Sequence, residues 1–151
     1  MITVSIEPFK VVEDNQHLIA EHWNEVASKD GGRQLNVDWD TFNLYEKTNH
    51  LVTIVARDDG EVVGYAVFII MKQLHAMDYL MAHNDALFLK KEHRKGRAGI
   101  MLIKESNKIL GELFPGILVA WHVKPHMDFS PILIKLGYSK LDTIYAIKAG
   151  N

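Results

Sequence analysis

Apolar residues near the start of the chain recur with the periods of a strand and then of two helices. Ile2, Val4 and Ile6 alternate with polar residues, which predicts a half-buried strand that ends at Pro8. Between residues 13 and 28 the apolar side chains fall on one helical face, with Asp14 or Asn15 available as a cap. The residues that end this helix are Lys29, Asp30, Gly31 and Gly32, and Asp38 caps a short second helix that ends near Asn49.

The middle of the chain reads as an antiparallel meander. Residues 51–57 and 61–71 are rich in β-branched and aromatic side chains, and the turn signal Asp58-Asp59-Gly60 joins them as a hairpin. The pattern loosens over residues 73–83, where we expect a loop. A strand resumes over residues 85–89.

A basic turn, residues 90–99, connects that strand to a long amphipathic helix. The helix carries Ile100, Ile103, Leu110 and Leu113 on one face. The first amides of a helix lack partners within the helix and carry partial positive charge, so a turn of this kind forms a site for a phosphate or pyrophosphate. The alternative is a solvated basic turn between two packed elements, and the spacing leaves both open.

Three further elements complete the chain. Residues 117–121 are a short apolar run typical of a strand buried on both faces, which makes a βαβ crossover with two parallel strands. Residues 128–136 predict a helix with Gly137 as its C-terminal cap, and residues 138–147 predict a final strand. The pattern therefore predicts one α/β (α+β) domain over residues 1–151. Its mixed, mostly antiparallel sheet has about six to seven strands, flanked by about four helices.

Composition narrows the class of protein. The 151 residues are 48% hydrophobic and 24% charged, with a net charge of −2, which argues against a dedicated nucleic-acid binder. No cysteine is present, so a thiolate metal site or nucleophile is excluded. The histidines lack metal-ligand spacing, since His17 and His22 are five residues apart on one helix. The longest apolar run is about half a membrane span, and the first residues lack a signal-peptide pattern. These observations predict a cytoplasmic protein with no metal and no membrane contact.

The order of the predicted elements resembles the GCN5-related N-acetyltransferase (GNAT) fold over nearly the whole chain. Four pieces carry the resemblance: the acidic-glycine hairpin at residues 58–65, the strand, turn and helix at 87–102, the buried strand at 117–123, and Lys135-Leu136-Gly137-Tyr138. The chain is also similar to small acetyltransferase-like proteins of bacteriophages, because it has an arginine-glycine turn, the pair His22-Trp23 and Asp85. A bacteriophage source would place the protein in the cytoplasm of the host.

This resemblance implies that the chain binds acetyl-CoA. The strand backbone would contact the pantetheine arm, and the turn amides would hold the pyrophosphate. The family motif has Gln or Arg, two residues, Gly, one residue, then Gly or Ala; here Arg97 stands at the first glycine and Gly96 comes one position early. Arg97 fits only with ordinary backbone torsions and an outward side chain. The implied cofactor residues are Leu87, Phe88, Leu89, Arg94, Lys95, Gly96, Arg97, Ala98, Gly99, Ile100 and His126.

Acetyl transfer to an amine requires a base for the amine proton and an acid for the leaving thiolate. The family's usual acid is a tyrosine, and Leu133 occupies its position here, so Tyr138 and Tyr145 are the alternatives. Asp85 and His83 are the catalytic candidates, because they share strand parity and could face one cleft. Alternatively, Asp85 is a structural hydrogen-bond acceptor and His83 lies in an exposed loop.

Three functions follow from this reading. The first is an acetyl-CoA-dependent N-acetyltransferase acting on an amine of a small molecule, peptide or protein. The second is a catalytically weak CoA-binding interaction module, and the third is a nucleic-acid or phosphoprotein binder that uses the basic turn. Acceptor contacts are expected from residues 29–37, 73–83 and 142–145. Pairing of the final strand with another subunit leaves a homodimer open.

Overall fold

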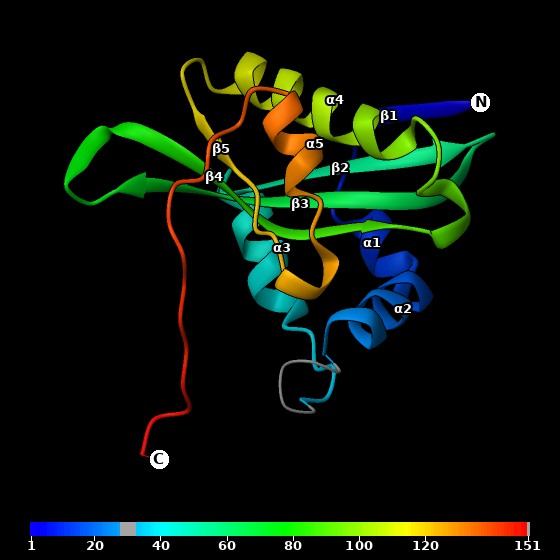
Figure 1. The fold of residues 1–151 in the computed structure, drawn as a ribbon, viewed down its shortest axis with the longest axis horizontal. Helices are drawn as coiled ribbons and strands as arrows, with labels where there is room; N and C mark the ends of the chain where they lie inside the picture. Colours follow the sequence, from blue (N-terminus) through cyan, green and yellow to red (C-terminus); the bar gives the residue numbers. More distant parts are fainter. Residues whose placement is uncertain (28–32, 151) are drawn as a thin grey trace.

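The computed structural model describes residues 1–27 and 33–150 (Figure 1). Its strands are β1 (Ile2–Ile6), β2 (Leu51–Asp58), β3 (Glu61–Gln73), β4 (Ala76–Leu89) and β5 (Leu118–Ala120). Its α-helices are α1 (Lys10–Asp14), α2 (Gln16–Val26), α3 (Trp39–Lys47), α4 (Ala98–Leu113) and α5 (Ser130–Lys135). Two 3₁₀ turns, η2 (Lys91–His93) and η3 (Pro125–Met127), follow β4 and β5.

The strands form one mixed sheet in the order β1-β2-β3-β4-β5. The first four pair antiparallel, and β5 pairs parallel to β4, as the predicted crossover requires. The α+β class is therefore confirmed. The predicted number of strands is wrong, because the described residues form five strands rather than six to seven.

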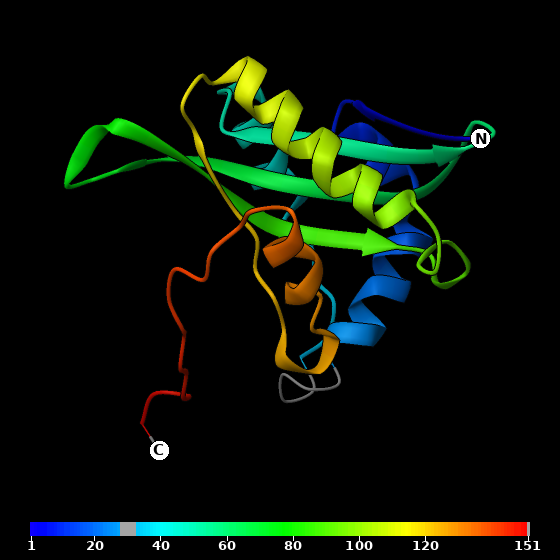
Figure 2. The same cartoon turned by 45° about the horizontal axis from the view of Figure 1, so that its top comes forward.

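Helices cover both faces of the sheet, and each face has its own apolar core (Figures 1 and 2). On one face α4 packs against β1, β2 and β3, and Leu102 and Leu110 are fully buried there with Phe68. On the other face Phe9, Val12 and Leu18 from α1, α2 and the segment before them pack against Tyr65 and its neighbours. This layering places the start of α4 at the end of β4, where the basic turn lies.

The β2–β3 hairpin is confirmed in detail. Asp59 and Gly60 both have positive φ, +46° and +91°, which is the geometry of a tight two-residue hairpin turn. Gly64 in β3 has a different role, because a Cβ there would lie 2.6 Å from the carbonyl oxygen of Phe88. Glycine at this position lets β4 approach β3 closely.

The long β3–β4 hairpin corrects the prediction for residues 73–83. Most of that segment belongs to β4, and Met71 pairs with Met81 in a ladder that runs nearly to the turn. The alternation of apolar and polar residues is weak there because the outer part of the β3–β4 hairpin is exposed on both faces. Its large apolar side chains Met77 and Tyr79 are themselves exposed. Without a buried face, strand residues need not alternate between apolar and polar.

The first helix is divided, which corrects the single helix predicted over residues 13–28. Asn15 separates α1 from α2 with φ −112° and ψ 45°, and its side chain donates to Val11 O (2.7 Å) instead of capping α2. Residues 28–32, where the helix was predicted to stop, lie outside the described residues. The cap of α3 is confirmed, since Asp38 Oδ1 accepts from Thr41 N at 3.0 Å.

The C-terminal third shows the largest departures. The β5 strand has three residues rather than five, and Leu118 is 45% exposed, so β5 is an edge strand and is not buried on both faces. Helix α5 is shorter than predicted, but Gly137 (φ +94°) ends it as expected. Residues 138–147 do not form the predicted strand, because no neighbouring strand of the described chain pairs with them. No helix among the described residues is long and apolar enough to span a membrane.

Candidate functional site

The parallel strands β4 and β5 stay paired for only three residues and then separate. The ladder joins Met81 to Leu118, Ala82 to Val119 and His83 to Ala120. Beyond this point β4 continues to Leu89 with no strand of the described chain on its β5 side. The separation leaves an open β4 edge over residues 84–89.

A β-bulge at the start of this open edge sets the position of Asp85. Val67 pairs with Ala86 and Phe68 with Asn84, so Asp85 has no partner on β3. The buried Asn84 amide holds the bulge by donating to Ala86 O (2.8 Å) and Val67 O (3.4 Å). Bulges re-aim a side chain in this way, and here Asp85 is left only partly exposed.

Three titratable side chains meet beside the bulge. The rings of His83 and His122 are 6.0 Å apart, and His122 is close enough to Asp85 to favour its carboxylate form. Burial nevertheless raises the pKa of Asp85, and burial together with the His122 charge lowers the pKa of His83. The carboxylate is thus a stronger base than an ordinary aspartate, and the His83 imidazole is held in its neutral form.

His83 and Asp85 each lie close to His122, but the bulge interrupts the alternation of the strand at Asp85, so their sharing of one cleft stays a prediction. Asp85 accepts no hydrogen bond from the described part of the chain, so it is not a structural acceptor there, and His83 is a half-buried strand residue rather than a loop residue. His122, just past β5, was not predicted to belong to this site. Its sequence neighbours carry no motif, and only the pairing of β5 with β4 brings it close.

The basic turn leads into the N-terminus of α4 with unsatisfied amides. The backbone N–H groups of residues 95–100 have no acceptor within the described chain, while the next amide, Met101 N, donates to Arg97 O at 2.9 Å. The first turn of α4 contains no acidic residue that could supply the missing acceptor. An anion fits this end of the helix.

The unusual placement of Arg97 and the glycines is explained by ordinary backbone geometry. Arg97 has φ −78° and ψ −16°, and its side chain is exposed, as its fit to a glycine position required. Gly96 and Gly99 also avoid positive φ. A Cβ at Gly96 would meet nothing within 4 Å, and one at Gly99 would first meet Leu89 Cδ2 at 3.8 Å. The fold itself therefore requires glycine at neither position.

Arg94 makes contacts that the sequence did not predict. Its Nε donates to Leu89 O (2.6 Å), and Nη2 donates to both carboxylate oxygens of Glu25 on α2 (2.8 and 2.7 Å). Its guanidinium carbon also lies 5.7 Å from the ring centroid of Phe88. Arg94 thus ties α2 to the end of β4, and a role toward a bound anion stays a prediction.

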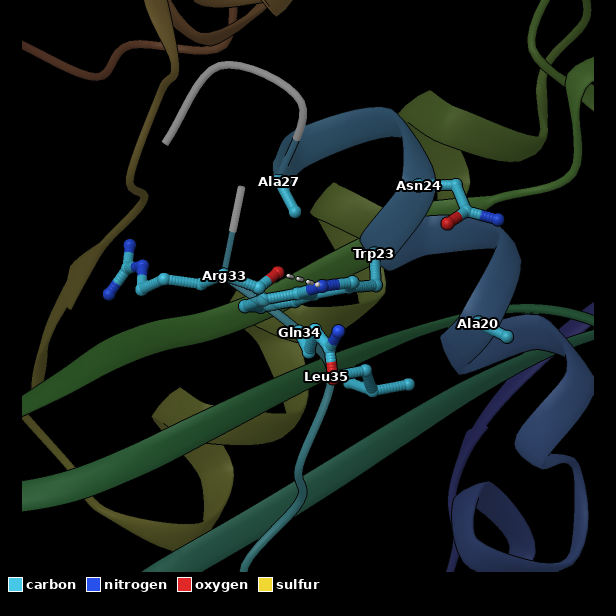
Figure 3. Close-up of a pocket in the computed structure, with 7 residues that line it drawn as sticks. All are labelled: Ala20, Trp23, Asn24, Ala27, Arg33, Gln34 and Leu35. Carbon is cyan, nitrogen blue, oxygen red and sulfur yellow. Dashed lines mark hydrogen bonds between the residues drawn. The ribbon is translucent and has the colours of Figure 1, made fainter. Parts of the chain in front are cut away.

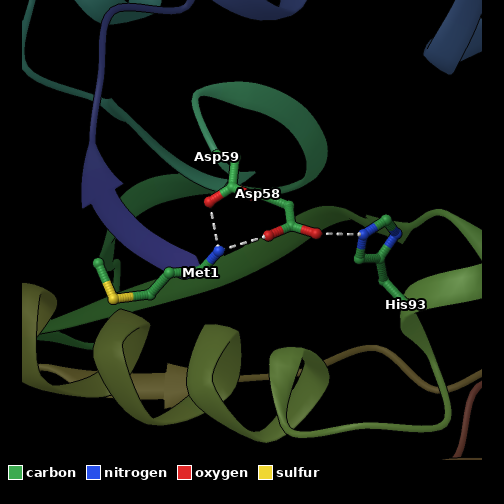
Figure 4. A network of polar contacts seen from close by, with 4 residues as sticks. All are labelled: Met1, Asp58, Asp59 and His93. Carbon is green, nitrogen blue, oxygen red and sulfur yellow. Dashed lines mark hydrogen bonds and ion pairs between the residues drawn. The ribbon is translucent and has the colours of Figure 1, made fainter.

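A second polar network fixes the turn from the opposite side (Figure 4). His93 Nε2 lies 3.1 Å from Asp58 Oδ2, and the N-terminal amine of Met1 donates to Asp58 (2.9 Å) and Asp59 (2.5 Å). These contacts connect η2 to the β2–β3 hairpin. The turn is therefore anchored to the sheet before α4 begins.

A buried His–Tyr pair lies beneath the site on the α2 face. His22 Nδ1 is 3.0 Å from the Tyr65 hydroxyl, and its ring packs on Phe88. Burial lowers the pKa of His22 to about 4, so it is neutral near pH 7. Burial also raises the pKa of Tyr65, and the Asp85 charge adds to this, which places the tyrosine near the bulge.

The remaining predicted residues are dispersed. Leu133 is buried, so an apolar side chain fills the position of the family's tyrosine. The Tyr138 hydroxyl is buried against Trp121 without a well-formed hydrogen bond in the described chain, and burial raises its pKa. Tyr145 is 92% exposed on the C-terminal segment, and His126 is exposed on η3. Leu87, Phe88 and Leu89 form the end of the open β4 edge, next to Ala98 and Ile100 at the start of α4.

A depression on the surface lies between α2 and residues 33–35 (Figure 3). Trp23 closes one side of it, and its indole Nε1 donates to Arg33 O at 3.0 Å. Ala20, Asn24, Ala27, Gln34 and Leu35 complete the lining. Arg33, Gln34 and Leu35 belong to the acceptor segment predicted over residues 29–37, of which residues 29–32 lie outside the described residues. The predicted acceptor segment at 142–145 lies apart from the sheet (Figures 1 and 2).

A protein family and several solved structures match this chain. Residues 12–138 match the acetyltransferase (GNAT) family. A ribosomal-protein-alanine N-acetyltransferase from Brucella melitensis biovar Abortus 2308 superposes with a TM-score of 0.76 at 17% identity, covering 100% of this chain and 99% of that one. A predicted acetyltransferase with acetyl-CoA from Clostridium acetobutylicum has a TM-score of 0.68 at 15% identity, covering 98% and 96%.

The same fold occurs in an aminoglycoside acetyltransferase from an uncultured soil metagenomic sample, solved with trehalose. Its TM-score is 0.69 at 14% identity, and the match covers 97% of each chain. A search of curated protein sequences gives no match. The family match spans well over half of the residues and includes β2 to α5. The chain belongs to the GNAT family of acetyltransferases.

Proposed function

We propose that this chain is an acetyl-CoA-dependent N-acetyltransferase whose base is Asp85, assisted by His83. The observation that carries the proposal is the separation of β4 from β5. Asp85, His83 and His122 lie at one end of the open β4 edge. The other end of this edge leads to the α4 N-terminus, whose first amides have no acceptor in the described chain. A long ligand with an anionic end and a reactive end fits such a path.

The residues present are compatible with CoA. Over residues 84–89 the β4 edge that faces away from β3 has no strand partner and offers backbone hydrogen bonds to an amide-containing arm, apart from Ala86 O and Leu89 O, which already accept from Asn84 and Arg94. The amides of residues 95–100 offer donors to a pyrophosphate. The side chains of Lys95 and Arg97 are exposed beside those amides. When bound, acetyl-CoA supplies the acetyl group as a thioester. The Clostridium acetobutylicum protein, which has the same fold, was solved with acetyl-CoA, and this supports acetyl-CoA as the ligand.

The proposed chemistry is direct transfer within a ternary complex. Asp85 takes the proton of the acceptor amine, directly or through water, as the amine nitrogen bonds to the acetyl carbonyl carbon, and its raised pKa makes it a better base than an ordinary aspartate. The bond between that carbon and the thioester sulfur breaks, and the leaving thiolate takes a proton from water. Neutral His83 accepts a hydrogen bond or relays the proton, and His122 stabilises the carboxylate. The described chain shows no group of three or more His, Asp or Glu residues that could hold a metal ion, and the proposal uses none.

Turnover by the variant Asp85→Asn tests this assignment. We expect kcat to fall by about 10²–10⁴-fold, the usual contribution of a general base, while acetyl-CoA binding measured by titration calorimetry stays unchanged. The acceptor panel includes an alanine-starting peptide and an aminoglycoside, the classes named for two structural neighbours. Asp78→Asn is the matched control, because Asp78 is an exposed aspartate on the same strand. Equal turnover of the two variants would show that Asp85 is not the base.

A second candidate function is a CoA-binding interaction module with little turnover. The burial of Leu133 at the position of the family's tyrosine favours it, since the usual proton donor is absent from that place. The two candidates differ in one measurement. A module binds acetyl-CoA but releases no free thiol with any amine of the panel, whereas an enzyme releases thiol with at least one.

A further inference from the structure

Arg94, the last residue before the free amides that lead into α4, is held by three other parts of the domain. Its Nε donates to Leu89 O (2.6 Å) at the end of β4, and its Nη2 donates to both carboxylate oxygens of Glu25 on α2 (2.8 and 2.7 Å). Its guanidinium also lies over the buried ring of Phe88. Nε and Nη2 are therefore engaged within the domain before any anion binds.

The carboxylate of Glu25 is the more enclosed half of this ion pair. The Glu25 side chain is 13% exposed, whereas that of Arg94 is 33% exposed. A carboxylate this far from water needs a charged partner, because loss of the partner would leave it desolvated and unpaired. Glu25 therefore holds the guanidinium against α2 and keeps it from turning outward.

The residues that follow Arg94 have little support of their own. Residues 95–97 are exposed, a Cβ at Gly96 would meet nothing within 4 Å, and no side-chain hydrogen bond caps α4. The segment is fixed at its ends: α4 packs on the sheet after it, and His93 and Arg94 are tied to other elements before it. The tie through Arg94 is the one directly adjacent to the free amides.

We propose that Glu25 is a positioning residue for the cofactor, which acts through Arg94 on the backbone amides of residues 95–100. The inference rests on the proposed function, because these amides are the proposed pyrophosphate site. An anion binds more tightly to donors that are already in place, since their ordering then costs no free energy at binding. Glu25 supplies this order without contacting the ligand, and Arg94 is the anchor of the turn rather than a direct ligand of the phosphate.

The sign of the effect separates positioning from plain electrostatics. Glu25 carries a negative charge near a site for an anion, so as a charge alone it would oppose anion binding, and its removal would tighten that binding. As a positioning residue it favours anion binding, and its removal weakens it. The variant Glu25→Gln keeps the size of the side chain and removes the charge that holds Arg94.

Calorimetric titration with acetyl-CoA tests the inference. We expect Glu25→Gln to weaken acetyl-CoA binding by about tenfold, which is the cost of ordering one or two residues at binding. The matched control is Glu21→Gln, which removes the same charge from a half-buried acid about one turn earlier on α2 and should leave the affinity unchanged. Thermal unfolding checks that each variant is folded at the temperature of the titration.

Arg94→Lys is a second and independent variant. A lysine keeps the positive charge, but its single ammonium cannot bridge Leu89 O and Glu25 as the planar guanidinium does. We expect Arg94→Lys to weaken acetyl-CoA binding by about tenfold as well. The double variant Glu25→Gln with Arg94→Lys should bind no more weakly than either single variant, because both changes break the same tie.

Three results would contradict the inference, and they are distinguishable from one another. If the native chain binds acetyl-CoA and Glu25→Gln binds it as tightly or more tightly, Glu25 is only a neighbouring charge, and the proposed function still stands. If the losses in the double variant are additive, Arg94 acts on the ligand directly and not through Glu25. If the native chain does not bind acetyl-CoA, the proposed function is wrong and this inference is wrong with it.

Discussion

Replacing Gly99 by alanine separates binding from folding at the proposed pyrophosphate site. Gly99 is the second residue of α4, and its φ is not positive. An added Cβ would meet only Leu89 Cδ2 at 3.8 Å, an ordinary van der Waals contact. The free protein therefore accommodates the methyl group, whereas a phosphate packed against the backbone would not.

We expect Gly99→Ala to raise the stability of the fold and to lower its affinity for acetyl-CoA. Alanine in a helix is favoured over glycine by about 0.5–1 kcal/mol, which raises the melting temperature of a domain of this size by roughly 1–4 °C. A lost hydrogen bond to a charged group costs about 1.5–3 kcal/mol, which weakens acetyl-CoA binding by about 10–100-fold. The variant should thus be more stable and bind less tightly.

Gly111→Ala is the matched control. Gly111 lies near the other end of α4, and a Cβ there meets nothing within 4 Å, so a methyl group fits at both glycines. We expect the same rise in melting temperature with unchanged affinity. Both proteins are compared by thermal unfolding and by calorimetric titration with acetyl-CoA. The pyrophosphate assignment is refuted if Gly99→Ala, and then the bulkier Gly99→Val, both bind acetyl-CoA as tightly as the native chain.

Two further predictions concern stability and pH. The His22 pKa is lowered to about 4 from 6.5 by burial, so the unfolded state binds the proton more tightly, and stability should fall by about 2 kcal/mol between pH 7 and pH 5. Urea unfolding at the two pH values should show a smaller fall in the free energy of unfolding for His22→Phe than for the native chain. His17 is exposed, so the control His17→Phe should show the same fall as the native chain. Equal falls for His22→Phe and the native chain would contradict a neutral, desolvated His22 ring. Arg57 donates to both carboxylate oxygens of Glu7 (2.8 and 2.7 Å), and these hydrogen bonds lower the pKa of Glu7. The ion pair therefore stabilises the fold above about pH 4.5, and this contribution to stability is lost as the pH falls and Glu7 becomes protonated. Glu7→Gln should cost about 1–3 kcal/mol at pH 7 and little at pH 3, and a cost independent of pH would show that the charge is not responsible.

The sequence alone determined the elements whose signals are local. The turn at Asp59-Gly60, the cap at Asp38 and the long amphipathic helix α4 were predicted because each depends on neighbouring residues. The strand, turn and helix around residues 87–113 indicated an anion site for the same reason, and the GNAT resemblance follows from the order of these parts.

Tertiary structure decided what depends on distant pairing. Asp85 is aimed by a bulge that exists only in register with β3, and His122 reaches it only because β5 pairs with β4. Glu25 binds Arg94 across 69 positions of sequence, a distance at which no periodic pattern carries information. Residues 138–147 have the composition of a strand, but a strand forms only where a neighbouring edge supplies hydrogen bonds, and none of the described strands pairs with this segment.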